Sequence, residues 1–453
     1  IGTTQFTNAF VENKRLEKVA VVRLGHPATI SVPPCIDFSS NLRKIIGENF
    51  WILPGGYEFD GRFLGDWSEE EVKKAAYEIA SKAIKYIAVS CVFSPINEKQ
   101  EIETAKILKK YVPEAIITMS HRIGRVGFIE RENATIMNSS LGFLANKVIT
   151  SFDGALKKLK IKCPFYISQN DGTLMAANIV KNYPVLTFAS GPTNSMRGAA
   201  FLSGHKNAIV VDIGGTTTDF GVIKEGFPRE SSIPADIGGV RTNFRMPDLV
   251  SIGLGGGSLI EFNNNEVKVG PESVGYKLTS ESLIFGGNKL TASDIAISQG
   301  LANFGDKEKI SHLDKKIIIK TMQVIKQMIE EGIDRVKLNK DPVPVILVGG
   351  GNILVENNLE GAEEVIIPDY SDVANAIGAS LAQAGGEIDK IYSYSDIGRE
   401  KSLELAKLDA IKRAKEAGAK TETISIIELE EIPLSYLPSG AVRLHVKAVG
   451  DLF

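Results

Sequence analysis

The chain has 453 residues, which predicts about two to three domains and enough buried surface for a sizeable core. Hydrophobic residues make up 43% and charged residues 24%, as in ordinary globular proteins, and a net charge of −3 gives no reason to expect a nucleic-acid partner. The three cysteines lie far apart, which indicates neither a zinc ribbon nor a disulfide framework. No apolar run approaches the roughly 20 residues that span a bilayer, and no signal peptide opens the sequence. We therefore expect a cytoplasmic protein without a membrane partner.

Strands and helices alternate in the first part of the chain. Residues 2–9 (GTTQFTNA) read as a strand end that enters a helix, with Thr3 or Thr4 as its N-cap. Apolar residues at spacings of three and four predict a helix over 69–87 that begins after Ser68. Further strands are predicted over 18–24, 86–92, 115–119, 163–168 and 185–189, and further helices over 98–111, 129–147, 151–159 and 172–180. This alternation indicates an α/β sheet.

Two junctions in this part are candidates for ligand contact. The helix predicted over 172–180 could present its N-terminus to an anion. Ser190 and Gly191 stand between the strand predicted over 185–189 and a helix of small residues that runs to 200. An ordinary capped turn and a binding loop account for Ser190 and Gly191 equally well.

Residues 207–223 (NAIVVDIGGTTTDFGVI) carry the most informative pattern of the chain. A buried strand over 208–211 ends at Asp212, and a second apolar strand begins with Asp219 at its head. Gly214 and Gly215 between them lack the side chains that would keep a phosphate from backbone N–H groups. Hydroxyl donors follow at Thr216, Thr217 and Thr218. The pattern predicts a phosphate-binding hairpin whose two carboxylates hold a hydrated Mg²⁺.

Two common nucleotide-binding loops do not fit this hairpin. Both a Walker A loop and a dinucleotide fingerprint run into a helix and need different glycine spacings. A structural Gly-Gly hairpin with a threonine rim remains the plain alternative, and the two acids that bracket the turn argue against it.

A second glycine cluster follows a predicted strand within residues 344–353 (PVILVGGGNI). Three consecutive glycines would let the backbone lie against adenine or ribose, and Asn352 could add a hydrogen bond; these glycines are Gly349, Gly350 and Gly351. Residues 375–379 (NAIGA) place small side chains at helical spacing, which suits a helix that packs closely on another.

The remaining segments complete the predicted organisation. Residues 224–283 are glycine-rich and β-like, and helices are predicted over 290–302 and 310–331. A terminal unit holds a long helix over 396–417 and strands over 423–428 and 441–449. We expect domain boundaries that give residues 1–205, 206–390 and 391–453.

The order of three elements in this chain resembles that of the actin-like ATPase superfamily. These elements are the phosphate hairpin at 207–223, the glycine cluster at 344–353 and the small-residue helix at 375–379. The chain also resembles the hydantoinase A/5-oxoprolinase family in several ordered stretches: 2–9, 168–173 (SQNDGT), 190–192 (SGP), 211–219, 252–258 (IGLGGGS), 269–273 (VGPES) and 433–440 (PLSYLPSG). The resemblance implies two RNase-H-like halves around a nucleotide cleft, an inserted β-rich segment and a small α/β C-terminal unit.

The resemblance also implies function. Members of that family couple ATP hydrolysis to the opening of cyclic amides such as hydantoins and 5-oxoproline, and a second subunit of hydantoinase B type often completes the reaction. It implies ATP and Mg²⁺ as cofactors, Asp212 and Asp219 as catalytic metal ligands, and an oligomeric enzyme. Substrate contacts are expected at Thr3, Thr4, Asn8, Ser190, Gly191 and Asp248.

This sequence departs from the family pattern at three places. The first phosphate hairpin is absent, so we expect it upstream of Ile1. The family's Asp-x-His element keeps Asp248 but has Val250 at the histidine position, and the element that should follow near Gly275 is not recognisable. A role that depends on that histidine is not carried over. A small-molecule kinase of the same superfamily and a non-catalytic, nucleotide-switched activator remain alternative functions.

Overall fold

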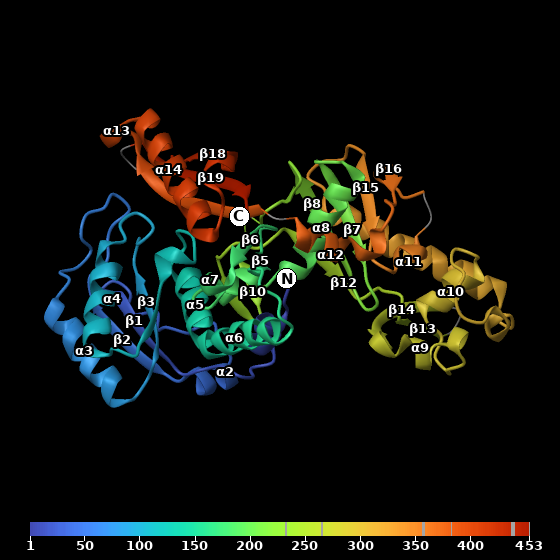
Figure 1. The fold of residues 1–453 in the computed structure, drawn as a ribbon, viewed down its shortest axis with the longest axis horizontal. Coiled ribbons are helices and arrows are strands. Elements are labelled where there is room, and N and C mark those ends of the chain that lie inside the picture. Colours follow the sequence, from blue (N-terminus) through green and yellow to red (C-terminus); the bar gives the residue numbers. More distant parts are fainter. Residues whose placement is uncertain (232, 264–265, 356–357, 382, 436–439, 453) are drawn as a thin grey trace. The chain divides into compact units, whose positions relative to one another are not determined.

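A computed structural model describes residues 1–231, 233–263, 266–355, 358–381, 383–435 and 440–452. The chain divides into two compact units. Unit 1 comprises Ile1–Ala189, Ser232–Met246 and Ala382–Phe453, and unit 2 comprises Ser190–Ser231 and Pro247–Leu381. Each unit is built on its own sheets and helices (Figure 1).

The first sheet of unit 1 is parallel, in the order β2-β1-β3-β4. Alternate residues of β1 enter two different cores: Val19 and Val21 pack in one, and Ala20, Val22 and Leu24 in the other. Both faces of the sheet are thus covered, as expected for a parallel sheet. Its strands are β1 (Val19–His26), β2 (Asn49–Pro54), β3 (Tyr86–Cys91) and β4 (Ile116–Met119).

Helices α3 and α4 pack on one core of this sheet and α5 and α6 on the other (Figure 1). The helix α3 begins where the sequence predicts, because the Ser68 hydroxyl accepts a hydrogen bond from the Glu71 N–H. The helices of this part are α1 (Gln5–Val11), α2 (Ser40–Ile46), α3 (Glu69–Ser81), α4 (Lys99–Tyr111), α5 (Phe128–Ser140), α6 (Gly142–Lys158) and α7 (Ala177–Val180).

The second sheet of unit 1 joins segments far apart in the sequence, in the order β18-β19-β17-β6-β5. Helix α14 packs on it through a row of buried alanines, Ala406, Ala410 and Ala414. Its elements are β5 (Tyr166–Ser168), β6 (Leu174–Ala176), β17 (Gln383–Ser393), α13 (Tyr394–Ile397), α14 (Arg399–Ala417), β18 (Ser425–Pro433) and β19 (Ala441–Asp451). The hairpin β10 (Ala235–Ile237) and β11 (Val240–Thr242) also belongs to unit 1.

Unit 2 is built on a mixed sheet in the order β12-β8-β7-β15-β16, with β9 paired to β8. Ile209 and Val211 of β7 pack against helix α11, while Val210 packs on the side of helix α8. The strands are β7 (Ala208–Ile213), β8 (Thr218–Lys224), β9 (Phe227–Pro228), β12 (Leu249–Ile252), β13 (Ser258–Asn263), β14 (Glu266–Ser273), β15 (Val343–Val348) and β16 (Ala362–Ile366). The helices are α8 (Ser190–Ser203), α9 (Leu278–Glu281), α10 (Ala292–Ser298), α11 (Lys315–Val336) and α12 (Ala374–Ser380).

Helices α8 and α12 pack with their backbones almost in contact. A Cβ atom at Gly378 would lie 1.8 Å from the carbonyl oxygen of Asn194, and one at Gly198 would lie 1.9 Å from that of Ala374. The prediction of a closely packed small-residue helix over 375–379 is therefore confirmed.

Two predicted elements near the middle of the chain are wrong. The strand predicted over 185–189 is a 3-10 helix, Pro184–Thr187, because Pro184 begins a helical turn. The helix predicted over 172–180 forms only in its second half, as α7, while Leu174–Ala176 is strand β6, which pairs with β5 and β17. A short apolar run is ambiguous between helix and strand, and here long-range pairing decides.

The compact units also group the residues differently from the expected boundaries. Helix α8 belongs to unit 2 because it packs on α12 and the β7 sheet, and the terminal residues join unit 1 through the β17–β6 pairing. Of the motif at 433–440, positions 436–439 lie outside the described residues.

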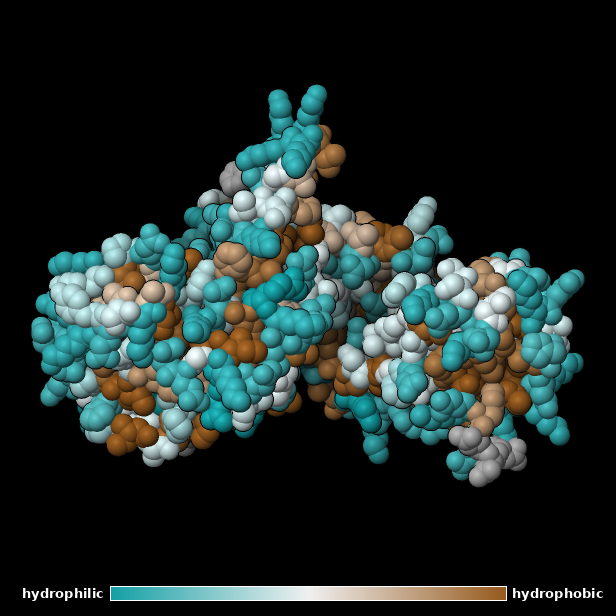
Figure 2. Space-filling model, turned by 90° about the horizontal axis from the view of Figure 1, so that it is seen from below, coloured by the Kyte–Doolittle hydropathy of each residue, from teal (hydrophilic) through white to brown (hydrophobic). Residues whose placement is uncertain are grey.

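Among the helices of the described ranges, none has the length and apolar character needed to cross a bilayer. On the face that Figure 2 shows, hydrophobic residues emerge in several places between hydrophilic ones.

Candidate nucleotide site

Strands β7 and β8 form the hairpin that the sequence predicts in unit 2. They pair antiparallel, with Asp212 directly opposite Asp219. The turn closes with a 2.9 Å hydrogen bond from the Gly214 N–H to the Thr217 carbonyl oxygen. Gly215, Thr216 and Thr217 are exposed at its tip. The tip of the loop therefore exposes glycine backbone and two threonine hydroxyls, and the two facing carboxylates lie on the strands just before and after it.

The two carboxylates are partly buried and close enough to influence each other. Burial raises the pKa of Asp212 above its usual value, although a hydrogen bond with Ser195 of α8 opposes this. Burial also raises the pKa of Asp219, with a smaller contribution from the negative charge of Asp212, while the Ser251 hydroxyl donates to Asp219 Oδ1 and opposes the rise. A cation between the carboxylates would offset this repulsion. Because Mg²⁺ prefers carboxylate oxygens, the pair fits Mg²⁺.

Thr218 has a different position from the other two threonines of the motif. It is buried, and its hydroxyl donates a 2.7 Å hydrogen bond to the carbonyl oxygen of Leu254. Thr218 thus joins the hairpin to the glycine-rich segment 253–258, and the exposed hydroxyls are those of Thr216 and Thr217.

The glycine-rich segment 253–258 clasps the hairpin turn through its backbone. The Gly256 N–H donates to the Gly214 carbonyl oxygen at 3.0 Å, and the Gly257 N–H donates to that of Gly215 at 2.8 Å. A Cβ atom at Gly255 would lie 2.5 Å from the Thr216 nitrogen. This contact was not predicted from the sequence, although three adjacent glycines are a sign of close backbone approach.

The second glycine cluster follows β15, and two of its three members, Gly349 and Gly351, approach the same hairpin, whereas a Cβ atom at Gly350 would meet nothing within 4 Å. Gly349 has a φ of +84°, and a Cβ atom there would lie 2.5 Å from Asp212 Oδ1. The Gly351 N–H donates a 2.8 Å hydrogen bond to the Ile213 carbonyl oxygen. The side-chain amide of Asn352 donates to the Ser371 hydroxyl at 2.8 Å. The second glycine cluster thus lies beside Asp212, and its adenosine-binding role stays a prediction.

The expected substrate residues are distributed over both units. Ser190 and Gly191 begin α8, the helix that carries Ser195, and the Gly191 carbonyl oxygen accepts a 2.8 Å hydrogen bond from Asn375. Asp248 is held by Arg229, with Nη2 at 2.6 Å from Oδ2. In unit 1, Thr3 and Thr4 immediately precede α1, and Asn8 lies in the middle of that helix. Their roles in substrate binding stay predictions.

Val250 marks the departure from the family's Asp-x-His pattern. It pairs with Phe220 in the β12–β8 ladder and packs against the core of unit 2, while the next residue, Ser251, pairs with Asp219. This position is thus structural, and the polar contact to Asp219 comes from Ser251. Neither Ser195 nor Ser251 was identified from the sequence, because only the fold brings them to the two aspartates.

Two family models match this chain. The hydantoinase/oxoprolinase model matches residues 131–336, and the model of the hydantoinase/oxoprolinase N-terminal region matches residues 1–112. The caprolactamase subunit alpha of Pseudomonas jessenii is 23% identical over 436 residues, and the acetophenone carboxylase gamma subunit of Aromatoleum aromaticum is 25% identical over 257 residues. The matches cover 84% and 54% of this chain, but only 61% and 34% of the length of these relatives.

Solved structures share the fold. The ATP-dependent caprolactamase from Pseudomonas jessenii has a TM-score of 0.77 at 18% identity, over 99% of this chain and 77% of that chain. Nucleotide-free acetone carboxylase has a TM-score of 0.62 at 15% identity, over 100% of this chain and 78% of that chain. The predicted α/β fold of the actin-like ATPase type is confirmed. With both family models matching in the expected order, the chain belongs to the hydantoinase/oxoprolinase family.

Proposed function

We propose that this chain is the ATP-using part of an enzyme that opens a cyclic amide such as a hydantoin, 5-oxoproline or a related lactam. The observation that carries the proposal is the facing pair Asp212 and Asp219 across a Gly-Gly turn that two further glycine segments clasp. The family and the names of the relatives, a caprolactamase subunit among them, supply the substrate class.

Each part of the site has a role in this reaction. Asp212 and Asp219 would hold Mg²⁺, which neutralises phosphate charge when bound. The Gly214–Gly215 backbone and the hydroxyls of Thr216 and Thr217 would bind the β- and γ-phosphates. Because the clasping segments fix the turn before any ligand arrives, these donors need little rearrangement. The segment from Gly349 to Asn352 would contact the adenosine.

Phosphorylation explains why ring opening needs ATP. An amide carbonyl is a poor electrophile because resonance stabilises it. Transfer of the γ-phosphoryl group from ATP to the carbonyl oxygen activates the carbonyl carbon, so that water can add to it. The ring C–N bond then breaks as the nitrogen takes up a proton, which leaves an acyl phosphate, and a second water releases phosphate and the open-chain acid. We further propose that a hydantoinase B-like subunit completes the hydrolysis, since curated relatives of this chain are subunits of larger enzymes.

Phosphate release tests the proposal. The purified protein would be incubated with ATP, Mg²⁺ and caprolactam, hydantoin or 5-oxoproline, with and without a hydantoinase B-like protein encoded beside it. We expect one lactam to stimulate phosphate release and to yield the open-chain acid. A small-molecule kinase would instead leave the phosphate on its product, and a nucleotide-switched activator would bind ATP without lactam-dependent turnover.

A further inference from the structure

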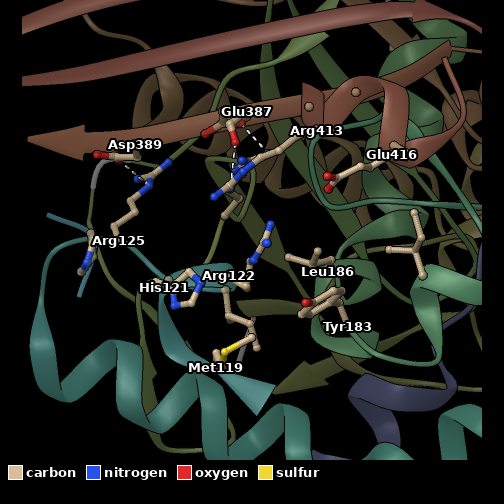
Figure 3. A pocket seen from close by; sticks show the side chains of 18 of the residues that line it. Met119, His121, Arg122, Arg125, Tyr183, Leu186, Glu387, Asp389, Arg413 and Glu416 are labelled. Carbon is tan, nitrogen blue, oxygen red and sulfur yellow. Dashed lines mark hydrogen bonds and ion pairs between the residues drawn. The ribbon is translucent and has the colours of Figure 1, made fainter. Parts of the chain in front are cut away.

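Unit 1 contains a cavity of about 320 Å³ that the proposed ATP chemistry does not use (Figure 3). One side is formed by the end of β4 and the 3-10 turn Ser120–Arg122, and the other by β17 and α14. A third side is apolar and includes Ile179, Tyr183 and Leu186. The size is in the range of small-molecule sites, with mixed apolar and charged surroundings.

His121 brings an unsatisfied nitrogen to this cavity. Its side chain is only 2% exposed, and its Nδ1 lies 2.6 Å from the carboxylate of Glu101, which is fully buried. Glu101 also accepts hydrogen bonds from the His121 N–H at 3.1 Å and from the Ser120 hydroxyl at 2.5 Å. Among the described residues, Nε2 has no hydrogen-bond partner; the nearest carboxylate, that of Glu98, is 3.5 Å away. A buried ring that is oriented this firmly and left open on one side points to a ligand.

Glu101 is well suited to fix the ring. Burial by itself would raise the pKa of Glu101. The hydrogen bonds and charge of His121, together with the Ser120 hydroxyl, outweigh this effect and hold the pKa below its usual value. The carboxylate is therefore ionised at neutral pH and accepts the Nδ1 proton, which leaves Nε2 directed at the cavity.

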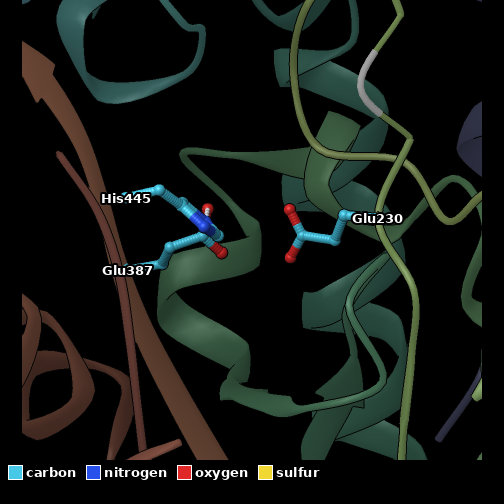
Figure 4. A group of neighbouring side chains, drawn as sticks. All are labelled: Glu230, Glu387 and His445. Carbon is cyan, nitrogen blue, oxygen red and sulfur yellow. Dashed lines mark hydrogen bonds and ion pairs between the residues drawn. The ribbon is translucent and has the colours of Figure 1, made fainter. Parts of the chain in front are cut away.

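Four arginines line the same space, and they differ in their partners. Arg125 is paired with Asp389, with Nε 3.3 Å from the carboxylate. Arg245 is neutralised by Glu387, with Nη1 2.7 Å from the carboxylate. Glu387 is buried and also contacts His445 Nε2 at 2.6 Å (Figure 4). Since Glu387 is held by both Arg245 and His445, it is not a free counter-ion for a third cation.

The other two arginines keep unused hydrogen-bond donors. Arg413 donates through Nη1 to the backbone carbonyl of Glu387 at 3.0 Å, and its pKa is lowered by burial and by the charges of Arg245 and Arg122. Within the described part of the chain, the Arg122 guanidinium has no hydrogen bond or ion pair. Figure 3 shows Arg122 and Arg413 directed toward the same space from the 3-10 turn and from α14.

The charge balance of the lining favours a monoanion. Five cationic side chains and four carboxylates line the cavity, which leaves one excess positive charge. A dianion such as a phosphate monoester would leave this balance negative. The apolar side of the cavity suits a hydrocarbon body.

We propose that this cavity binds a small organic carboxylate, whose carboxylate group pairs with Arg122 and Arg413 and whose aliphatic body lies against Tyr183 and Leu186. With the proton on Nδ1, His121 Nε2 adds a hydrogen-bond acceptor to the polar side of the cavity and does not itself pair with the carboxylate. A guanidinium is the natural partner because it can form two parallel hydrogen bonds to a carboxylate. The inference goes beyond the proposed ATP chemistry and does not depend on it.

Calorimetric titration of the purified protein with hexanoate tests this site. We expect saturable binding of one hexanoate, and at least about tenfold weaker binding for Arg122→Gln and Arg413→Gln, since each loses a charged, bidentate partner. Arg335→Gln, the same substitution at an exposed position of α11, should keep the wild-type affinity. Thermal unfolding verifies that each variant folds, and Arg122→Lys, which keeps the charge, should lie between wild type and Arg122→Gln.

Further probes distinguish the alternatives. Hexanamide, which lacks the charge, should bind at least about tenfold more weakly than hexanoate. Inorganic phosphate that binds as tightly as hexanoate would overturn the carboxylate assignment. Hexanoate binding that is undetectable in the wild type, or equal in wild type and Arg122→Gln, would overturn the site itself. Asp212→Asn should bind hexanoate as the wild type does; a loss there would place the carboxylate at the nucleotide hairpin instead.

Discussion

Asp212 and Asp219 stand directly opposite each other on neighbouring strands, one at the end of β7 and one at the start of β8. Like charges in this relation repel, and here both carboxylates are also partly buried. The pair therefore costs stability unless a cation lies beside it.

Asp212→Asn should abolish lactam-dependent phosphate release, lowering turnover by at least about 100-fold, because it removes one of two carboxylates proposed to hold the metal. The assay is phosphate release at saturating ATP and Mg²⁺. Asp334→Asn makes the same change on the exposed face of α11 and should leave turnover unaltered. Wild-type turnover in Asp212→Asn would refute the role of Asp212.

Asp219→Asn should stabilise the metal-free protein at pH 7 by up to about 1 kcal/mol. The pKa of Asp219 is raised in the folded state relative to 3.8, so the native state holds the proton more tightly than the unfolded state does. Wild-type stability thus falls as pH rises through the interval between 3.8 and the folded pKa, and the cost is fully present above it.

Urea unfolding at pH 7 and at about pH 3.5 measures this effect. The stability difference between Asp219→Asn and wild type should shrink at the lower pH, where the carboxylate is mostly protonated in both the folded and the unfolded state. Mg²⁺ should stabilise wild type more than the variant. An equal difference at both pH values would show that charge is not its cause.

Gly255→Ala should weaken nucleotide binding more than it weakens the fold. The added methyl group would lie 2.5 Å from the Thr216 nitrogen and 2.6 Å from the Gly215 carbonyl carbon, so the hairpin turn must shift. We expect at least about tenfold lower affinity for a fluorescent ATP analogue, because a displaced backbone donor loses its hydrogen bond to phosphate. An affinity equal to that of wild type would show that the contact between residues 253–258 and the hairpin turn is not needed for nucleotide binding.

Gly378→Ala should destabilise the protein by about 2 kcal/mol or more, since the methyl group would overlap the Asn194 carbonyl oxygen at 1.8 Å and force α8 and α12 apart. Gly154→Ala is the matched control. Gly154 lies within α6 and a Cβ atom there meets nothing within 4 Å, so alanine should stabilise by about 0.5–1 kcal/mol through helix propensity. Thermal unfolding of both variants should give shifts of opposite sign.

Arg23→Met should destabilise by about 3–5 kcal/mol, because it leaves Glu132 charged and buried without its partner. Arg23 and Glu132 are 0% and 1% exposed, and the Arg23 Nε donates to Glu132 Oε1 at 2.8 Å. The double variant Arg23→Met/Glu132→Leu should lose less than the two single changes together, since no charge is then left unpaired. Strictly additive losses in chemical unfolding would contradict this. As a control, Lys74→Met breaks the exposed pair with Glu71 and should change stability little.

Local features of the structure were predictable from the sequence. The hairpin at 207–223 follows from two apolar runs on either side of Gly-Gly. The close packing of the helix at 375–379 follows from small residues at helical spacing, whereas the identity of its partner, α8, was not predicted. The strand predicted over 185–189 was wrong because five mostly apolar residues after a proline show too little periodicity to distinguish a strand from a helical turn.

The sequence by itself determined the family, the α/β fold and the order of acids, glycines and hydroxyls around one turn. These features can be read from short stretches of neighbouring residues, so they do not require knowledge of how the chain packs. Tertiary structure alone decided that residues 253–258 clasp the turn, that Ser195 and Ser251 reach the aspartates, and that His121, Arg122 and Arg413 share a cavity. These contacts join residues up to about three hundred positions apart. Such pairings are set by which surfaces bury one another, and no local rule encodes that choice.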